Sequence, residues 1–204
     1  QMLSMKISKF IDDKSLEASK ELAIEYGEPK GMLGTGERNL TRTAVAPTTS
    51  SSFILGQVSQ SIEPIWSNTY VKDIAKIKTT IKNPFLEKLV EEKGQNTNDV
   101  WRSSCAYDGS VQHLTILTEE EKEVFKTYSE IDQMDIVYQA ANRQVHVDQG
   151  QSVNLMVHPD MPIKDINNLY VTAWKLGLKS LYYQHSMNAA QKFKQKKDCV
   201  ACEA

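Results

Sequence analysis

The sequence lacks a charge excess of one sign and any long apolar run. Its 204 residues include 24 basic and 26 acidic side chains, and the resulting net charge of −2 gives no strong field for a nucleic acid or a membrane surface. No apolar run approaches the length of a membrane span, and residues 1–7 lack the apolar core of a signal peptide. We therefore predict a cytoplasmic protein that binds neither nucleic acid nor membrane.

Cysteine is also scarce, with three residues of which Cys199 and Cys202 lie near the end of the chain. An odd, uneven set of this kind is not a disulfide framework and indicates a reducing compartment. The third, Cys105, has no histidine, cysteine or acidic pair at metal-ligand spacing around it, and the four histidines are scattered. We predict that Cys105 is a buried small apolar residue and that the chain holds no metal.

A hydroxyl-rich stretch stands out within a chain that is long enough for one domain with a real core. Residues 43–46 form a short apolar run typical of a buried strand, and Pro47 ends it. Thr48, Thr49, Ser50 and Ser51 follow, ahead of a helix expected over 53–58. Small hydroxyl residues at a helix start offer N–H and O–H donors that can bind phosphate. A capped turn without a ligand explains the same pattern.

Two neighbours of this stretch receive plainer interpretations. The glycine-rich residues 31–36 lack the Gly-Lys-Ser/Thr ending of a nucleotide P-loop, and we interpret them as a flexible connection. Arg42 could support a phosphate, but a salt-bridged arginine is the favoured interpretation. Glu63 stands before a proline, and we predict a residue of a surface turn.

The rest of the chain alternates helical patterns with short apolar strands, which predicts an α/β fold with parallel strands. Apolar residues at helical spacing predict helices over 16–26, 69–81, 84–90 and 131–142, with 134, 137, 138 and 141 facing inward. A further helix starts at Pro162, with 163, 166, 170, 173 and 174 on one face and a stop at Gly177. A capping box begins at Thr118 and a cap-like cluster covers 96–99. Strands are expected over 153–157, after the polar entry 147–152, and over 178–184.

Three motifs in order, the first in two parts, give the sequence a specific resemblance. Residues 41–52, then 61–64, the Leu-Tyr-Tyr-Gln of 181–184 and the terminal Cys-x-x-Cys resemble the C-terminal part of the large (alpha) subunit of class I ribonucleotide reductases, of the phage or bacterial type. The resemblance implies that residues 1–187 are the C-terminal part of a ten-stranded α/β barrel with peripheral helices. Residues 188–204 are then a flexible redox tail. A split gene or a cut from a longer chain would explain the length.

The same resemblance implies a function, the radical reduction of ribonucleoside diphosphates to deoxyribonucleoside diphosphates. Pro47 and the four residues Thr48–Ser51 would bind the substrate diphosphate, Tyr182 and Tyr183 would relay the radical, and Cys199 with Cys202 would reduce the active-site disulfide. Implied partners are an N-terminal fragment of the large subunit, a small radical-generating (beta) subunit and thioredoxin or glutaredoxin. The chain would bind no cofactor itself: the beta subunit carries the metal-radical cofactor, and the N-terminal part binds the nucleotide effectors.

Three features of that family have no match in the chain. Nothing matches its Asn-x-Cys-x-Glu radical loop, and its active-site cysteine pair and regulatory nucleotide domain are also absent. We therefore expect this chain to be inactive alone. A tyrosine pair by itself is more often core packing, and a lone Cys-x-x-Cys can be half of a zinc site. Two other classes stay open, a small stand-alone thiol-redox or phosphate-binding protein and a non-catalytic module that completes a partner's fold.

Overall fold

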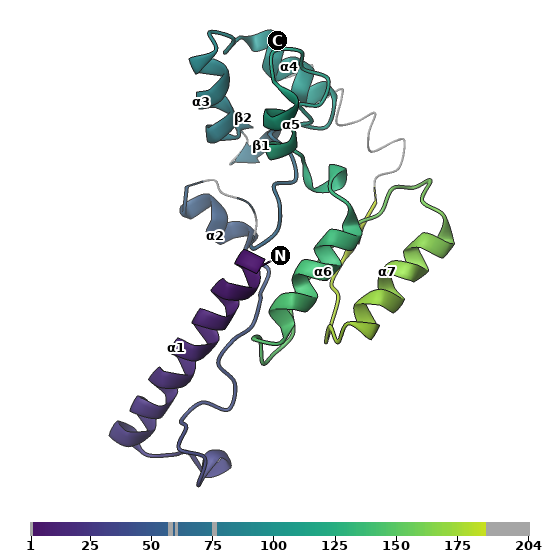
Figure 1. The fold of residues 1–204 in the computed structure, drawn as a ribbon. Coiled ribbons are helices and arrows are strands. Elements are labelled where there is room, and N and C mark those ends of the chain that lie inside the picture. Colours follow the sequence, from purple (N-terminus) through teal and green to yellow (C-terminus); the bar gives the residue numbers. More distant parts are fainter. Residues whose placement is uncertain (1, 57–58, 60, 75–76, 187–204) are drawn as a thin grey trace. The chain divides into compact units, whose positions relative to one another are not determined.

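The computed structural model describes residues 2–56, 59, 61–74 and 77–186 (Figure 1). The chain divides into two compact units, which are described separately below. Unit 1 comprises Gln1–Pro47, Asp132–Leu155 and Met161–Gln184, and unit 2 comprises Thr48–Ile131, Met156–Asp160 and His185–Ala204. None of the helices described is both long and apolar enough to span a membrane.

Three long helices make up most of unit 1. They are α1 (Met2–Tyr26), α6 (Gln133–Gln144) and α7 (Ile163–Lys175), and α6 packs against both of the others (Figure 1). The predicted helices are confirmed, although α1 begins earlier than residue 16. Gly27 with φ 77° and Gly177 with φ 81° follow α1 and α7, where a left-handed residue ends a helix at little cost to glycine. The short 3-10 helix η1 (Lys30–Met32) follows α1.

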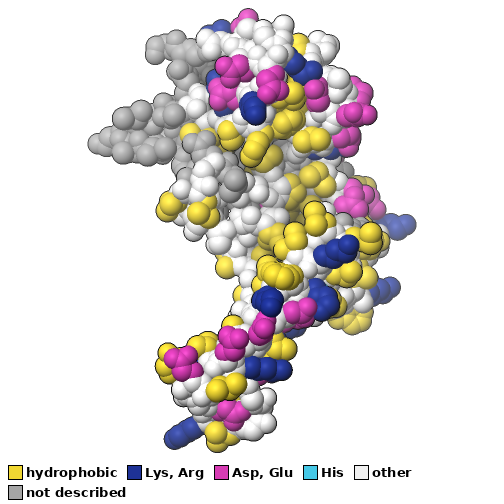
Figure 2. Space-filling view, turned by 60° about the vertical axis from the view of Figure 1, so that its left-hand side comes forward, with side chains coloured by type: hydrophobic (Ala, Val, Ile, Leu, Met, Phe, Trp, Pro, Cys, Tyr) yellow, Lys and Arg dark blue, Asp and Glu magenta, His cyan; other side chains and the backbone are white. Residues whose placement is uncertain are grey.

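The buried faces of α6 and α7 differ from the prediction. On α6 the buried apolar residues are Ile136, Val137, Ala140 and Ala141, whereas Tyr138 is 40% exposed. On α7 the i, i+4 pair Leu169 and Ala173 is buried, while Ile163 and Trp174 are 85% and 76% exposed. A rotation of about 100° per residue places a side chain just beyond such a stripe on the surface. Figure 2 likewise shows hydrophobic side chains among charged ones on the surface over α1.

The predicted strands appear as short parallel pairings. β3 (Leu155–Met156) pairs with β4 (Gln184–His185). The N–H of Tyr182 donates to the oxygen of Val153 at 2.8 Å and the N–H of Val157 to that of His185 at 2.8 Å, so the partners rise together along both strands. The strand expected over 43–46 is reduced to one parallel bridge between Val45 and Gln151.

The helix predicted over 69–81 is wrong, because these residues form a β-hairpin in unit 2. β1 (Thr69–Ile74) pairs antiparallel with β2 (Ile77–Lys82), from Thr69 opposite Lys82 to Ile74 opposite Ile77. The segment is rich in valine, isoleucine and threonine, whose branched Cβ restricts χ1 in a helix and suits a pleated strand. That preference outweighs the apparent helical spacing of four apolar residues.

The other elements of unit 2 are α2 (Thr49–Ile54), α3 (Pro84–Glu92), α4 (Asn98–Ala106), α5 (Glu119–Val124) and the 3-10 helix η2 (Tyr128–Glu130). Among them, α3, α4 and α5 agree with their predicted start signals. The side chain of Thr97 caps α4, and Thr118 with Glu121 forms the predicted capping box of α5. An apolar core forms around α3 and α4 from Leu86, Val90, Trp101, Val111, Leu114 and Leu117.

Two single-residue predictions in unit 2 have different outcomes. Glu63, expected in a surface turn, is only 9% exposed. It lies near His185, whose ring packs edge-on against Trp66 at 4.4 Å between centroids. Burial lowers the pKa of His185, and the charge of Glu63 partly opposes that shift. Cys105 is buried on α4, as predicted.

Candidate functional site

The hydroxyl-rich residues lie within a helix start rather than before it. Thr48 is the N-cap residue of α2, which begins at Thr49, whereas the sequence placed the helix start at 53. The N–H groups in the first turn of a helix have no acceptor within the helix. Thr48, Ser50 and Ser51 are exposed, so their hydroxyls occur along the same turn as the first N–H groups of the helix. The segment can therefore donate several hydrogen bonds to an anion.

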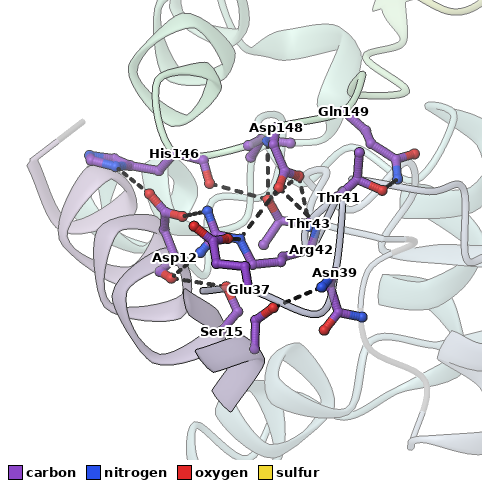
Figure 3. A network of polar contacts seen from close by, with 12 residues as sticks. Asp12, Ser15, Glu37, Asn39, Thr41, Arg42, Thr43, His146, Asp148 and Gln149 are labelled. Carbon is purple, nitrogen blue, oxygen red and sulfur yellow. Dashed lines mark hydrogen bonds and ion pairs between the residues drawn. The ribbon is translucent and has the colours of Figure 1, made fainter. Parts of the chain in front are cut away.

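Arg42 is not part of that donor set, because it is engaged inside unit 1. Its guanidinium lies 3.2 Å from a carboxylate oxygen of Asp12 on α1, 3.8 Å from Asp148 and 4.0 Å from Glu37 (Figure 3). Nδ1 of His146 lies 3.5 Å from the other oxygen of Asp12. The prediction of a salt-bridged arginine is confirmed. Arg42 thus links α1 to the extended segment that carries it.

Asp148 makes the most directed contacts of this network. Its carboxylate accepts the N–H of Arg42 and the N–H of Thr43, both at 2.8 Å, and the hydroxyl of Thr43 at 3.0 Å. Burial alone would raise the pKa of Asp148, but the N–H groups of Thr43 and Arg42, the Thr43 hydroxyl and the Arg42 charge together lower it. Asp148 is therefore an ionised carboxylate that holds backbone.

Tyr182 and Tyr183 are brought together as a ring pair in unit 1. Their centroids lie 4.1 Å apart with the planes at 52°, and the residues are 44% and 59% exposed. A hydrogen bond with Tyr183, then partial burial and the electrostatic effect of Tyr183, raise the pKa of Tyr182. The alternative of core packing does not fit side chains this exposed. The pair has two touching phenols that solvent or a partner can reach.

The backbone of the tyrosine pair is held by β3 and by Asn154, the residue before it. The N–H of Tyr183 donates to the side-chain oxygen of Asn154 at 3.3 Å, and the N–H of Leu155 donates to the oxygen of Tyr183 at 3.0 Å. On α7 the hydroxyl of Tyr170 donates to Oε1 of Gln184 at 3.1 Å. Parallel pairing thus fixes the backbone while the two rings project outward.

The remaining predicted site residues are not tested by the geometry. Cys199 and Cys202 lie outside the described residues. Pro47 belongs to unit 1 and Thr48–Ser51 to unit 2. Within the described part of the chain, no group of three or more histidine, cysteine or acidic residues could hold a metal ion.

Sequence reasoning missed the part played by Asp148. It singled out the polar entry 147–152 as either site lining or a hydrogen-bonded strand entry. The structure shows the second, since Asp148 and Gln151 bond to backbone, Gln151 donating to the oxygen of Ala140 at 2.8 Å. The partners of Asp148 lie 105 and 106 residues away in sequence, and no local pattern predicts a contact over that separation.

Comparisons with known proteins agree with the motifs. The family described as "Ribonucleotide reductase, barrel domain" matches residues 30–184. The ribonucleoside-diphosphate reductase large subunit of Invertebrate iridescent virus 3 is 38% identical over 99% of this chain, which covers 34% of that protein. The reductase subunit alpha of Chlamydia muridarum is 37% identical over 76% of this chain, which covers 14% of it.

A solved structure is similar over nearly the whole chain. The class Id ribonucleotide reductase alpha subunit of Actinobacillus ureae matches with a TM-score of 0.85 and 54% identity, over 94% of this chain and 35% of that one. The chain thus spans about a third of the length of the iridescent virus and Actinobacillus proteins. The resemblance drawn from the motifs is confirmed, and the fold is part of an α/β barrel: the chain belongs to the ribonucleotide reductase barrel-domain family.

Proposed function

We propose that this chain is a working part of a ribonucleoside-diphosphate reductase large subunit, which reduces ribonucleoside diphosphates to deoxyribonucleoside diphosphates by radical chemistry. The observation that carries the proposal is the 38% identity over 99% of this chain to a protein named as that subunit. The chain would contribute a diphosphate-binding turn, a radical relay and a redox tail. The radical-bearing cysteine and the active-site cysteine pair would come from the remaining length of the subunit.

The diphosphate-binding turn in this proposal is the run from Pro47 through Thr48, Thr49, Ser50 and Ser51. Its support is the start of α2 at Thr49, where N–H groups and exposed hydroxyls occur together. An anion near a helix start also interacts favourably with the positive end of the helix dipole. The turn then binds substrate mainly through backbone groups, which every residue type except proline possesses.

The radical relay consists of Tyr182 and Tyr183. A phenol can lose an electron and its proton together, and a radical on one ring is refilled by an electron and a proton from the next. The centroid separation of 4.1 Å supports transfer within the pair. The exposure of both rings supports exchange with a partner, here a small radical-generating (beta) subunit that holds the metal-radical cofactor.

The redox tail is formed by Cys199 and Cys202. Their two thiols would reduce an active-site disulfide, becoming a disulfide themselves, and a dithiol protein such as thioredoxin or glutaredoxin would restore them. Lysines at 194, 196 and 197 would favour the attacking thiolate. Replacing both cysteines with serine should spare a single turnover of pre-reduced enzyme and stop turnover driven by the dithiol protein. Sustained protein-driven turnover would rule the tail out.

Reconstitution tests the proposal as a whole. The chain is mixed with the N-terminal remainder of a large subunit, which would also bind nucleotide effectors, and with the beta subunit. Deoxyribonucleotide formation should need all three components. A stand-alone thiol-redox or phosphate-binding protein would act without them, and a module that only completes a fold would tolerate Tyr183→Phe in the mixture. Either result would replace the proposal.

A further inference from the structure

We propose that Asp148 is a positioning residue for substrate binding: its carboxylate fixes the backbone register of residues 42–45, which lead along the chain into the diphosphate-binding turn. The inference rests on the proposed function of Thr48–Ser51. It concerns a residue that touches neither substrate nor reacting atoms, and that acts through the segment it holds.

The contact between Asp148 and the segment is a reciprocal lock (Figure 3). One carboxylate oxygen accepts the N–H of Arg42 at 2.8 Å, and the other accepts the N–H and the hydroxyl of Thr43 at 2.8 Å and 3.0 Å. In return, the hydroxyl oxygen of Thr43 accepts the N–H of Asp148 at 3.1 Å. Four bonds join Asp148 to Arg42 and Thr43, and they admit one alignment of the two segments, because a shift by one residue would break all of them.

The backbone pairing beside this lock is too short to define its own register. It consists of one bridge, Val45 with Gln151, in which Val45 accepts the N–H of Ser152 at 2.9 Å and donates to the oxygen of Gly150 at 3.3 Å. The N–H of Gln149 adds a bond to the oxygen of Thr43 at 3.1 Å. A slip by one residue moves a strand by about 3.3 Å and turns every side chain to the opposite face. The side-chain lock therefore decides the register.

The segment that carries Asp148 is itself held by side-chain contacts with residues 179 and 180. The ammonium of Lys179 donates to the backbone oxygen of Asp148 at 2.6 Å, and the hydroxyl of Ser180 donates to that of Gln151 at 3.0 Å. A Cβ at Gly150 would lie 2.9 Å from the Ser180 hydroxyl oxygen, so the two segments approach closely there. Because Asp148 is held in place, its hydrogen bonds also fix the position of Thr43. Along the chain, Thr48 is only three residues beyond Val45, and one of the intervening residues is the stiff Pro47.

The test is steady-state kinetics of the assembled reductase with a nucleoside diphosphate substrate. Asp148→Asn removes the charge and one acceptor, and Thr43→Val removes the hydroxyl while keeping the shape. The matched control is Asp160→Asn, the same change at a side chain that is 89% exposed. KM should rise about tenfold for Asp148→Asn, as expected for losing about 1.4 kcal/mol. It should rise less for Thr43→Val and stay unchanged for the control, with kcat constant throughout.

A merely structural role gives the opposite pattern, because a smaller folded fraction lowers kcat and leaves KM unchanged. That pattern would overturn the inference, as would an unchanged KM in both variants. If the Asp148→Asn chain does not assemble into the reductase, the test rests on Thr43→Val, which should raise KM at constant kcat. The variant Ser50→Asp separates the two proposals: a raised KM there with an unchanged KM in Thr43→Val and Asp148→Asn removes only the positioning role. An unchanged KM in Ser50→Asp removes the diphosphate-binding turn itself.

Discussion

The two stretches that carry the proposed chemistry are built in opposite ways. Thr48–Ser51 form the first turn of a short helix, and their useful groups are backbone N–H donors together with hydroxyls. Tyr182 and Tyr183 lie directly before β4 and take part in the parallel pairing through their backbone, and their useful groups are side chains 44% and 59% exposed. The first stretch depends on where the backbone runs, and the second on which atoms the side chains end in.

That difference tells which substitutions should matter at each place. Deleting one hydroxyl from the turn leaves its N–H groups in place and should lower substrate affinity only slightly. An added negative charge should instead repel the diphosphate directly. Deleting one hydroxyl from the tyrosine pair removes the only group that can lose a proton and an electron together. The same chemical change, loss of one O–H, should thus be mild in one stretch and decisive in the other.

The largest effect is expected for Tyr183→Phe. The ring and its packing stay, but the O–H is lost, so deoxyribonucleotide formation should stop while substrate affinity is kept. Tyr170→Phe is a matched control, since it removes a phenol hydroxyl that donates to Gln184 at 3.1 Å and is not part of the ring pair. It should keep most of the turnover. Substantial turnover in Tyr183→Phe would make the pair ordinary surface tyrosines.

The next effect in size is expected for Ser50→Asp. A carboxylate at the first turn of α2 should repel a diphosphate and weaken substrate binding more than tenfold in the assembled enzyme. Ser50→Asn has a similar shape without the charge, and Ser50→Ala should cost about 1 kcal/mol, the usual value of one hydrogen bond. Affinity is measured by titration with a nucleoside diphosphate. Equal affinities for the Asp and Asn variants would show that no anion binds there.

The smallest effect concerns stability and pH at Asp148. Its folded pKa is lowered from 3.8, so it stabilises the folded chain fully at neutral pH, and the contribution is lost as pH falls from about 4 through the lowered folded value. Denaturant unfolding should give Asp148→Asn a deficit of about 1 to 2 kcal/mol at pH 7, on the scale of a charged hydrogen bond. The deficit should shrink as pH falls below 4. A deficit independent of pH would assign the effect to packing.

Local chemistry made much of the fold predictable. The capping box at Thr118, the stops at Gly27 and Gly177 and the helix start after Pro162 each depend on residues a few positions apart, and each is confirmed. The prediction for the segment of β1 and β2 was wrong. Its four apolar residues fitted a helical period, but their branched side chains favoured a strand. Where both patterns fit, the residue types decided the outcome.

The site was predictable only in its parts. Order and identity of the motifs indicated Thr48–Ser51 and the two tyrosines, but the sequence carries no sign that Asp148 bonds to Thr43, 105 residues earlier. The exposure of Trp174 on α7 was also missed. Whether a helix position is buried or exposed depends on which neighbouring element packs against it. The helical pattern alone locates the buried face only to within about one residue.

Hydrogen exchange of the assembled reductase, with and without saturating nucleoside diphosphate, tests the contrast between the two stretches most directly. Substrate should slow amide exchange at Thr49, Ser50 and Ser51, because those N–H groups donate to it. Amide exchange at Tyr182 and Tyr183 should stay unchanged, because their backbone is already paired and only their phenol side chains take part in the proposed radical transfer. Unchanged exchange at residues 49–51 under saturation would contradict the account.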